Sequence, residues 1–171
     1  MTTPLIMLVL MVAPYIVFRL LSTAMHRDFD ARRAASIGLT LLFIFTGVGH
    51  FIETESMSQM LPPWVPARVP IIYLTGILEF GIAIGFLFEK FRYPTGWVAA
   101  AVLVLFFPGN IYAAINHIPM GGHAWGPVYL LIRAPLQAII VFWVYWFTIR
   151  QPGAVPQEIS SSSALSPQVR N

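Results

Sequence analysis

Residues 69–88 read VPIIYLTGILEFGIAIGFLF, and this stretch decides the fold. Its twenty residues hold a single charged side chain, that of Glu79. A helix needs about 20 residues to cross the roughly 30 Å hydrocarbon layer of a membrane. The stretch therefore predicts a transmembrane helix with one ionisable group near its middle.

The rest of the chain has the same apolar character. Of its 171 residues, 57% are hydrophobic and 10% are charged, and the mean hydropathy is +0.74. A soluble domain of this size carries about a quarter charged residues, so the composition favours a membrane protein. We expect an all-α, polytopic transmembrane helical bundle with five spans. These are Pro4–Leu21, Ala35–Ile52, Val69–Phe88, Thr95–Ala114 and Val128–Ile149.

The basic residues indicate how the spans are oriented. The net charge of +3 comes from cations that lie between apolar runs and build no dense basic face, which argues against nucleic acid as a partner. Lys and Arg that flank spans are retained on the cytoplasmic side. Only Arg68 falls on the opposite side, so we expect the N-terminus outside and the C-terminus in the cytoplasm. The residues expected on the cytoplasmic side are Arg27, Arg32, Arg33, Lys90, Arg92 and Arg150.

The chain divides into three predicted parts. Residues 1–34 form an N-terminal transmembrane helix with a basic cytoplasmic loop, and residues 35–150 form a four-helix membrane domain. Residues 151–171 are rich in serine and proline and predict a disordered cytoplasmic tail. The small residues 22–24 also resemble a signal-peptide cleavage site. Because no basic residue precedes the first span and Arg19 interrupts its end, we expect this helix to be retained.

The composition also bears on the chemistry of a site. There is no cysteine, so the chain cannot form a disulfide, a thiol relay or an iron–sulfur cluster. The five His and Glu side chains expected on the outer side are poorly spaced for a metal, and we expect no metal site. They are His50, Glu53, Glu55, His117 and His123. Nucleophile-elbow, phosphate-loop and dinucleotide motifs are absent.

Polar side chains inside the spans are the candidate functional residues, because an ionisable group at membrane depth usually faces the bundle interior. Glu79 lies about 15 Å below the start of its span, close to the midplane. Arg133 lies about 8 Å below the outer end of the last span, with Gln137 one turn deeper on the same face. We expect Glu79 and Arg133 to form an ion pair. Such a pair either fixes helix packing or forms the polar floor of a pocket that opens outward.

Three further residues are candidates for this pocket. Asn110 follows Pro108 in a span that we expect to be kinked, and its amide bonds freed backbone carbonyls or points at the pocket. His50 lies near the outer interface as a structural histidine or as a proton donor or acceptor. Trp64, in the proline-rich segment 61–66, anchors a stiff interfacial connector or a lid over an apolar ligand.

Five short motifs follow one another along the membrane domain, and together they resemble the DoxX-like membrane proteins. They are TGVGHF (46–51), LPPWVP (61–66), TGILE (75–79), FPGNIY (107–112) and IRAPLQ (132–137). The resemblance covers about residues 35–149 and implies a four-helix core, to which the first helix is an addition. It also implies a membrane redox setting, since the family name derives from a subunit associated with electron transfer from thiosulfate to quinone. Glu79, Asn110, Arg133 and Gln137 match the family's polar positions.

Three functional hypotheses remain open. The first is an accessory or quinone-linked component of a redox system in the bacterial inner membrane, working with redox partner proteins. Its outward-facing pocket has Glu79 and Arg133 at the base, and His50, Trp64, Asn110 and Gln137 complete the ligand-binding set. The second is an enzyme that moves protons on a lipophilic small molecule, with Glu79 or His50 as the catalytic acid or base. The third is a structural or transport-related subunit without catalysis, for which transport would require a homo-oligomer.

Overall fold

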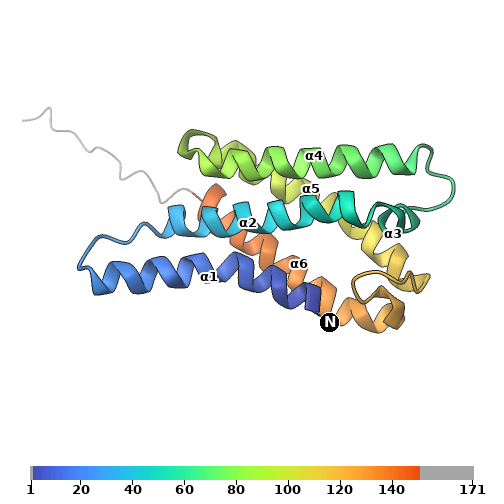
Figure 1. Ribbon diagram of the computed structural model, residues 1–171, viewed down its shortest axis with the longest axis horizontal. Helices are drawn as coiled ribbons and strands as arrows, with labels where there is room; N and C mark the ends of the chain where they lie inside the picture. The colour runs from blue at the N-terminus through green and yellow to red at the C-terminus, as the bar shows by residue number, and fades with distance from the viewer. Residues whose placement is uncertain (1, 151–171) are drawn as a thin grey trace, which may run out of the picture.

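The computed structural model describes residues 2–150, and this part of the chain is built from helices without any strand. The long helices lie roughly along one axis (Figure 1). In chain order the elements are α1 (Thr2–Ala24), α2 (Ala31–Ile52), α3 (Thr54–Gln59), α4 (Arg68–Leu87), η1 (Glu89–Phe91), α5 (Arg92–Ile115), η2 (His123–Tyr129), α6 (Leu130–Val144) and η3 (Tyr145–Ile149).

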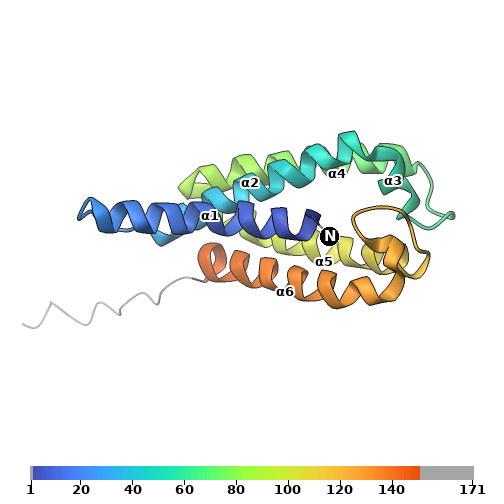
Figure 2. The same cartoon turned by 60° about the horizontal axis from the view of Figure 1, so that its bottom comes forward.

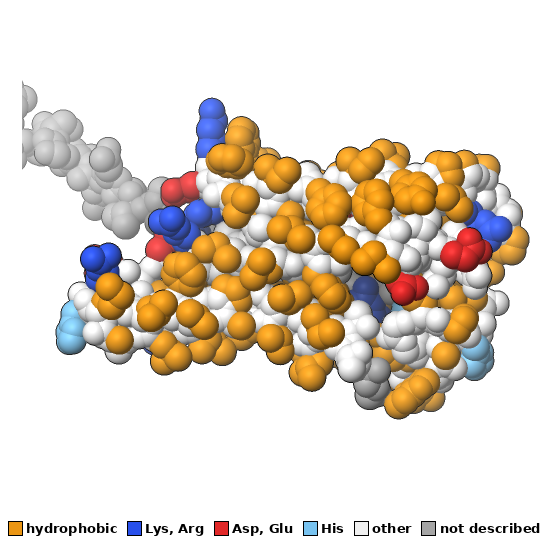
Figure 3. Space-filling model, viewed as in Figure 1, with side chains coloured by type: hydrophobic (Ala, Val, Ile, Leu, Met, Phe, Trp, Pro, Cys, Tyr) orange, Lys and Arg blue, Asp and Glu red, His pale blue; other side chains and the backbone are white. Residues whose placement is uncertain are grey.

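Five helical segments are long and apolar enough to cross a membrane, which confirms the predicted number of spans and indicates an integral membrane protein. They begin and end within a few residues of the expected bounds, except that the last span is built from three elements. Its first part is a 3₁₀ segment, and its end at η3 is a π-helical turn. The space-filling view shows hydrophobic side chains along the whole length of the molecule and charged side chains mainly near its two ends (Figure 3).

The two ends of the bundle differ in charge. The basic end, made of residues 25–33, 88–92 and 150, carries the six cations that the sequence placed on one side. Here the Arg32 guanidinium donates to the Arg150 carbonyl and joins the start of α2 to the end of the last span. The opposite end, called the α3 end, carries α3, the segment 60–67 and η2 (Figure 2). The sequence did not predict α3 or η2 as helical.

The helices α2 and α4 form a close pair in the bundle. A Cβ atom added at Gly76 of α4 would lie 2.8 Å from both the His50 Cβ and the Phe51 ring of α2. On the other face of α2, a Cβ at Gly38 would collide with the Met11 carbonyl of α1. Small residues thus let three consecutive membrane helices approach backbone to backbone.

The main apolar cluster and the largest group of buried polar side chains occupy different halves of the bundle. The apolar cluster fills the half nearer the basic end, and α1 contributes to it through Met7 and the fully buried Met11. Its remaining members are Leu39, Leu42, Phe43, Ile82, Ala83, Phe86, Ala99, Val102, Leu136, Ile140, Val144 and Ile149. Buried polar side chains of α2, α4, α5 and α6, among them Glu79 and Asn110, lie nearer the α3 end, whereas Ser36, Thr40 and Thr148 are buried nearer the basic end. The predicted tail, residues 151–171, lies outside the described residues.

Candidate functional site

Six polar side chains from four helices lie together in the half of the bundle nearer the α3 end, and we call them the polar layer. Glu79, His50, Asn110 and Gln137 are buried, whereas Thr75 and Arg133 are partly buried. His50 comes from α2, Thr75 and Glu79 come from α4, Asn110 from α5, and Arg133 and Gln137 from α6. The sequence singled out five of these six, and the structure brings all five into the interior.

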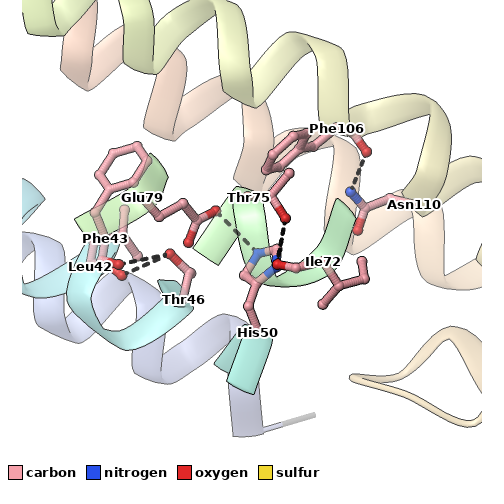
Figure 4. Close-up of polar contacts among 9 residues, drawn as sticks. All are labelled: Leu42, Phe43, Thr46, His50, Ile72, Thr75, Glu79, Phe106 and Asn110. Atoms are coloured by element: carbon pink, nitrogen blue, oxygen red, sulfur yellow. Dashed lines mark hydrogen bonds and ion pairs between the residues drawn. The ribbon is translucent and has the colours of Figure 1, made fainter. Parts of the chain in front are cut away.

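His50 is the centre of one half of the polar layer (Figure 4). Its Nδ1 atom lies 3.1 Å from the Ile72 carbonyl oxygen and 3.0 Å from the Thr75 hydroxyl. Its Nε2 atom lies 3.5 Å from Oε1 of Glu79. Thr75 and Glu79 are four residues apart and share one face of α4, so a hydroxyl, an imidazole and a carboxyl group follow one another across two helices.

Protons can be distributed in this row in more than one way. In one arrangement the Thr75 hydroxyl donates to the Ile72 carbonyl at 2.8 Å, and Nδ1 of His50 carries a proton and donates to the same carbonyl. Alternatively, the hydroxyl donates to Nδ1, and Nε2 then carries the proton that faces Glu79. The row can therefore hand a proton between the imidazole and the carboxyl group, which is what acid–base chemistry requires.

Arg133 is the centre of the other half. Its Nε atom donates to Oδ1 of Asn110 at 3.0 Å. The Asn110 amide in turn donates to the Phe106 carbonyl at 3.0 Å, so it bonds its own helix and also faces the site. The Phe106 ring lies 6.2 Å from the His50 ring between centroids, which connects the two halves. Gln137 donates from Nε2 to the Leu103 carbonyl at 2.6 Å and holds α6 against α5.

The ion pair expected between Glu79 and Arg133 is not formed, and that prediction is wrong. Within residues 2–150, Glu79 has its one ion-pair contact with His50. The reason is the packing of neighbours: Glu79 projects from α4 toward the closely packed α2, whereas Arg133 projects from α6 toward α5. The two groups still lie close enough for the charge of Glu79 to act on Arg133.

Several buried polar atoms of this region have no hydrogen-bond partner within residues 2–150. Leaving such an atom unpaired costs about 1–3 kcal/mol, so a cluster of them marks a place where another molecule can bind. Three belong to the polar layer: Oε2 of Glu79, Nη1 of Arg133 and Oε1 of Gln137. The fourth is Nε2 of His123. These four atoms make this region the candidate binding site.

His123 was weighed from the sequence only as a metal ligand, and the structure gives it a different setting. It is buried at the start of η2, with Nδ1 2.7 Å from the Met120 carbonyl and its ring 4.8 Å from the Tyr129 ring. Arg133 is near enough to act on it electrostatically. Gly122 precedes it at φ 109°, a conformation that glycine adopts readily. The Gly121–Gly122 pair is the sequence signal for a turn that folds back here.

Trp64 does not join this site. The side chain is 81% exposed at the α3 end, so the structure gives no sign of a lid closed by this residue. A shallow cleft of about 330 Å³ lies elsewhere, on α1, where it is lined by Tyr15, Arg19 and Thr23 among others. Within the described residues, no group of three or more His, Asp or Glu side chains could hold a metal ion.

Comparison with known proteins gives a family. The model described as "Domain of unknown function (DUF8561)" matches residues 39–148, which is well over half of the chain. The chain therefore belongs to this family, and the matched region contains every residue of the polar layer. No curated protein and no solved structure matches the chain.

Proposed function

We propose that this member of the DUF8561 family binds the polar head of a lipophilic small molecule of the quinone class in the polar layer. The observation that carries the proposal is the cluster of unpartnered buried atoms contributed by Glu79, Arg133, Gln137 and His123. Helices that carry them also expose large apolar side chains, among them Leu74, Ile77 and Leu131. A molecule with a polar ring and an apolar tail can reach such a site from the bilayer.

The polar layer has the groups that quinone chemistry uses. Reduction of a quinone to a quinol consumes two electrons and two protons. The His50–Glu79 contact supplies a route for proton exchange, and Nη1 of Arg133 is a donor for a quinone carbonyl. The chain has no cysteine to serve as an electron carrier, so the electrons come from a redox partner protein. The protein acts as an accessory or quinone-linked component of that system.

The resemblance to DoxX-like proteins supports this setting. Its motifs TGILE (75–79), FPGNIY (107–112) and IRAPLQ (132–137) contain most of the polar layer. The bilayer that holds the bundle is the bacterial inner membrane, with the α3 end outside and the basic end in the cytoplasm. In this orientation the polar layer lies in the outer half of the membrane.

Binding of a short-chain benzoquinone to the purified protein in lipid nanodiscs tests the proposal. We expect saturable binding that Arg133→Gln weakens at least about tenfold, because the buried donor to the ligand is lost. Arg68→Gln removes the same charge outside the polar layer and should bind like the wild type. Equal binding by both variants, or none by the wild type, would refute the proposal and favour a structural subunit.

A second candidate function is acid–base catalysis on a lipophilic substrate. The row of Thr75, His50 and Glu79 favours it, because a proton can move along the row without a redox partner. Carbonyl infrared spectra of protein labelled at glutamate test it. We expect a band of a protonated carboxyl group that Glu79→Gln removes and that the exposed-site control Glu55→Gln leaves in place. A spectrum without that band would contradict a neutral acid at Glu79.

A further inference from the structure

The unpartnered atoms of the site differ in their hydrogen-bonding character, and this difference selects a ligand. Three of the four, in Glu79, Gln137 and His123, are acceptors, and the fourth, in Arg133, is a donor. We propose that the site recognises the hydroxyl form of its ligand, a quinol or phenol, in preference to the carbonyl form. The inference rests on the proposed function and goes beyond it by naming the redox state that is bound.

The Glu79 carboxyl group presents an acceptor. Its Oε1 atom faces Nε2 of His50 at 3.5 Å, and one proton between these two atoms satisfies the contact. That proton resides on Nε2 or on Oε1, depending on how the Thr75 hydroxyl is turned. In each of these arrangements Oε2 has only lone pairs. It is buried and has no partner within residues 2–150, so a bound ligand with a hydrogen-bond donor would satisfy it.

Gln137 and His123 present the other two acceptors. The amide nitrogen of Gln137 must be the atom that contacts the Leu103 carbonyl, because a carbonyl oxygen only accepts. Its Oε1 therefore faces the interior. By the same reasoning, Nδ1 of His123 donates to the Met120 carbonyl. The neutral imidazole then offers a lone pair at Nε2.

Arg133 supplies the one unpartnered donor among these four atoms, at Nη1. Gln137 lies one helical turn from it, and both Glu79 and His123 are within reach of its charge. A quinone carbonyl can accept from Nη1 but leaves three buried acceptors unpaired. A hydroxyl group accepts from Nη1 and donates to one acceptor, and the second hydroxyl of a quinol donates to another.

As one of the three unpartnered acceptors, His123 takes part in recognising the ligand. It comes from η2, outside the long helices, and places a lone pair at the end of the polar layer nearest the α3 end. Each hydrogen bond gained on binding is worth about two- to tenfold in affinity. Two donated hydrogen bonds predict that the quinol binds about tenfold or more tightly than the quinone.

The test compares a short-chain benzoquinol with its benzoquinone under anaerobic conditions, using the wild-type protein in nanodiscs. We expect the quinol to bind about tenfold more tightly. Equal or tighter binding of the quinone would overturn this inference and leave the proposed function standing. Binding of neither form would overturn the proposed function and the inference with it.

Two variants identify the atoms responsible. His123→Leu and Gln137→Leu each remove one acceptor, so each should weaken quinol binding about two- to tenfold more than it weakens quinone binding. A loss of packing alone would weaken both ligands equally, which would contradict the role given to that residue. The wild-type comparison decides the inference even if one variant fails to fold.

Discussion

The close approach of α2 and α4 makes Gly76 a sensitive position. In Gly76→Ala, the new Cβ would lie 2.8 Å from the His50 Cβ and from the Phe51 ring, about 0.6 Å short of the 3.4 Å of an ordinary contact. The His50 Cβ is fixed to the backbone of α2 and cannot turn away, so the two helices must separate. Overpacking of this kind costs about 1–3 kcal/mol of stability. Because a change of 1 kcal/mol shifts Tm by about 2–4 °C for a chain of this size, we expect a clear loss on thermal unfolding in detergent.

Gly81 provides the matched control on the same helix. A Cβ there meets nothing within 4 Å, so Gly81→Ala should match the wild type or gain up to about 1 kcal/mol from its better helix propensity. Gly76→Ala should also weaken ligand binding, since it moves His50 relative to Glu79. If both variants unfold at the wild-type temperature, the close contact between α2 and α4 is absent, and the placement of His50 beside Glu79 is contradicted.

Three further predictions follow from other contacts. Asn110→Leu leaves Nε of Arg133 without its acceptor and should lower the unfolding free energy by about 2–4 kcal/mol. The double variant Asn110→Leu with Arg133→Leu should recover part of this loss. If the losses of the two single variants simply add in chemical unfolding, the two side chains are not coupled. Gly38→Ala places a Cβ against the Met11 carbonyl and should make the α1–α2 connector more sensitive to protease, and unchanged digestion would contradict that packing. Because the chain has no cysteine, single cysteines at positions 27 and 64 should react with an impermeant maleimide only at 64 in intact cells, and labelling at 27 alone would reverse the orientation.

The spans could be predicted from the sequence because lipid imposes a fixed length and an apolar composition on each of them. The burial of Glu79 followed for the same reason, since an ionised group cannot face hydrocarbon cheaply. Depth along a span is set by residue count, so the sequence could predict that the polar side chains of different spans lie at neighbouring levels. The α2–α4 contact that places His50 beside Glu79 depends on Gly76. Which face each helix turns toward its neighbour cannot be predicted from the lengths of the spans.

The partners of Arg133 and the role of His123 could not be predicted for a different reason. Arg133 bonds Asn110 because α5 and α6 face each other, and several helix arrangements would satisfy the same five spans. His123 lies in a segment that turns through Gly122 and Gly126 at positive φ, where no hydrophobic period indicates which side chains are buried. Irregular segments of this kind are set by tertiary contacts, whereas the spans are set by the bilayer.

Native mass spectrometry of the protein released from its own membrane shows whether the polar layer holds a quinone-class lipid. We expect the wild type and Arg68→Gln to retain a bound species with the mass of such a lipid and Arg133→Gln to lose it. Retention of the same species by Arg133→Gln, or its absence from the wild type, would show that the polar layer does not bind such a molecule.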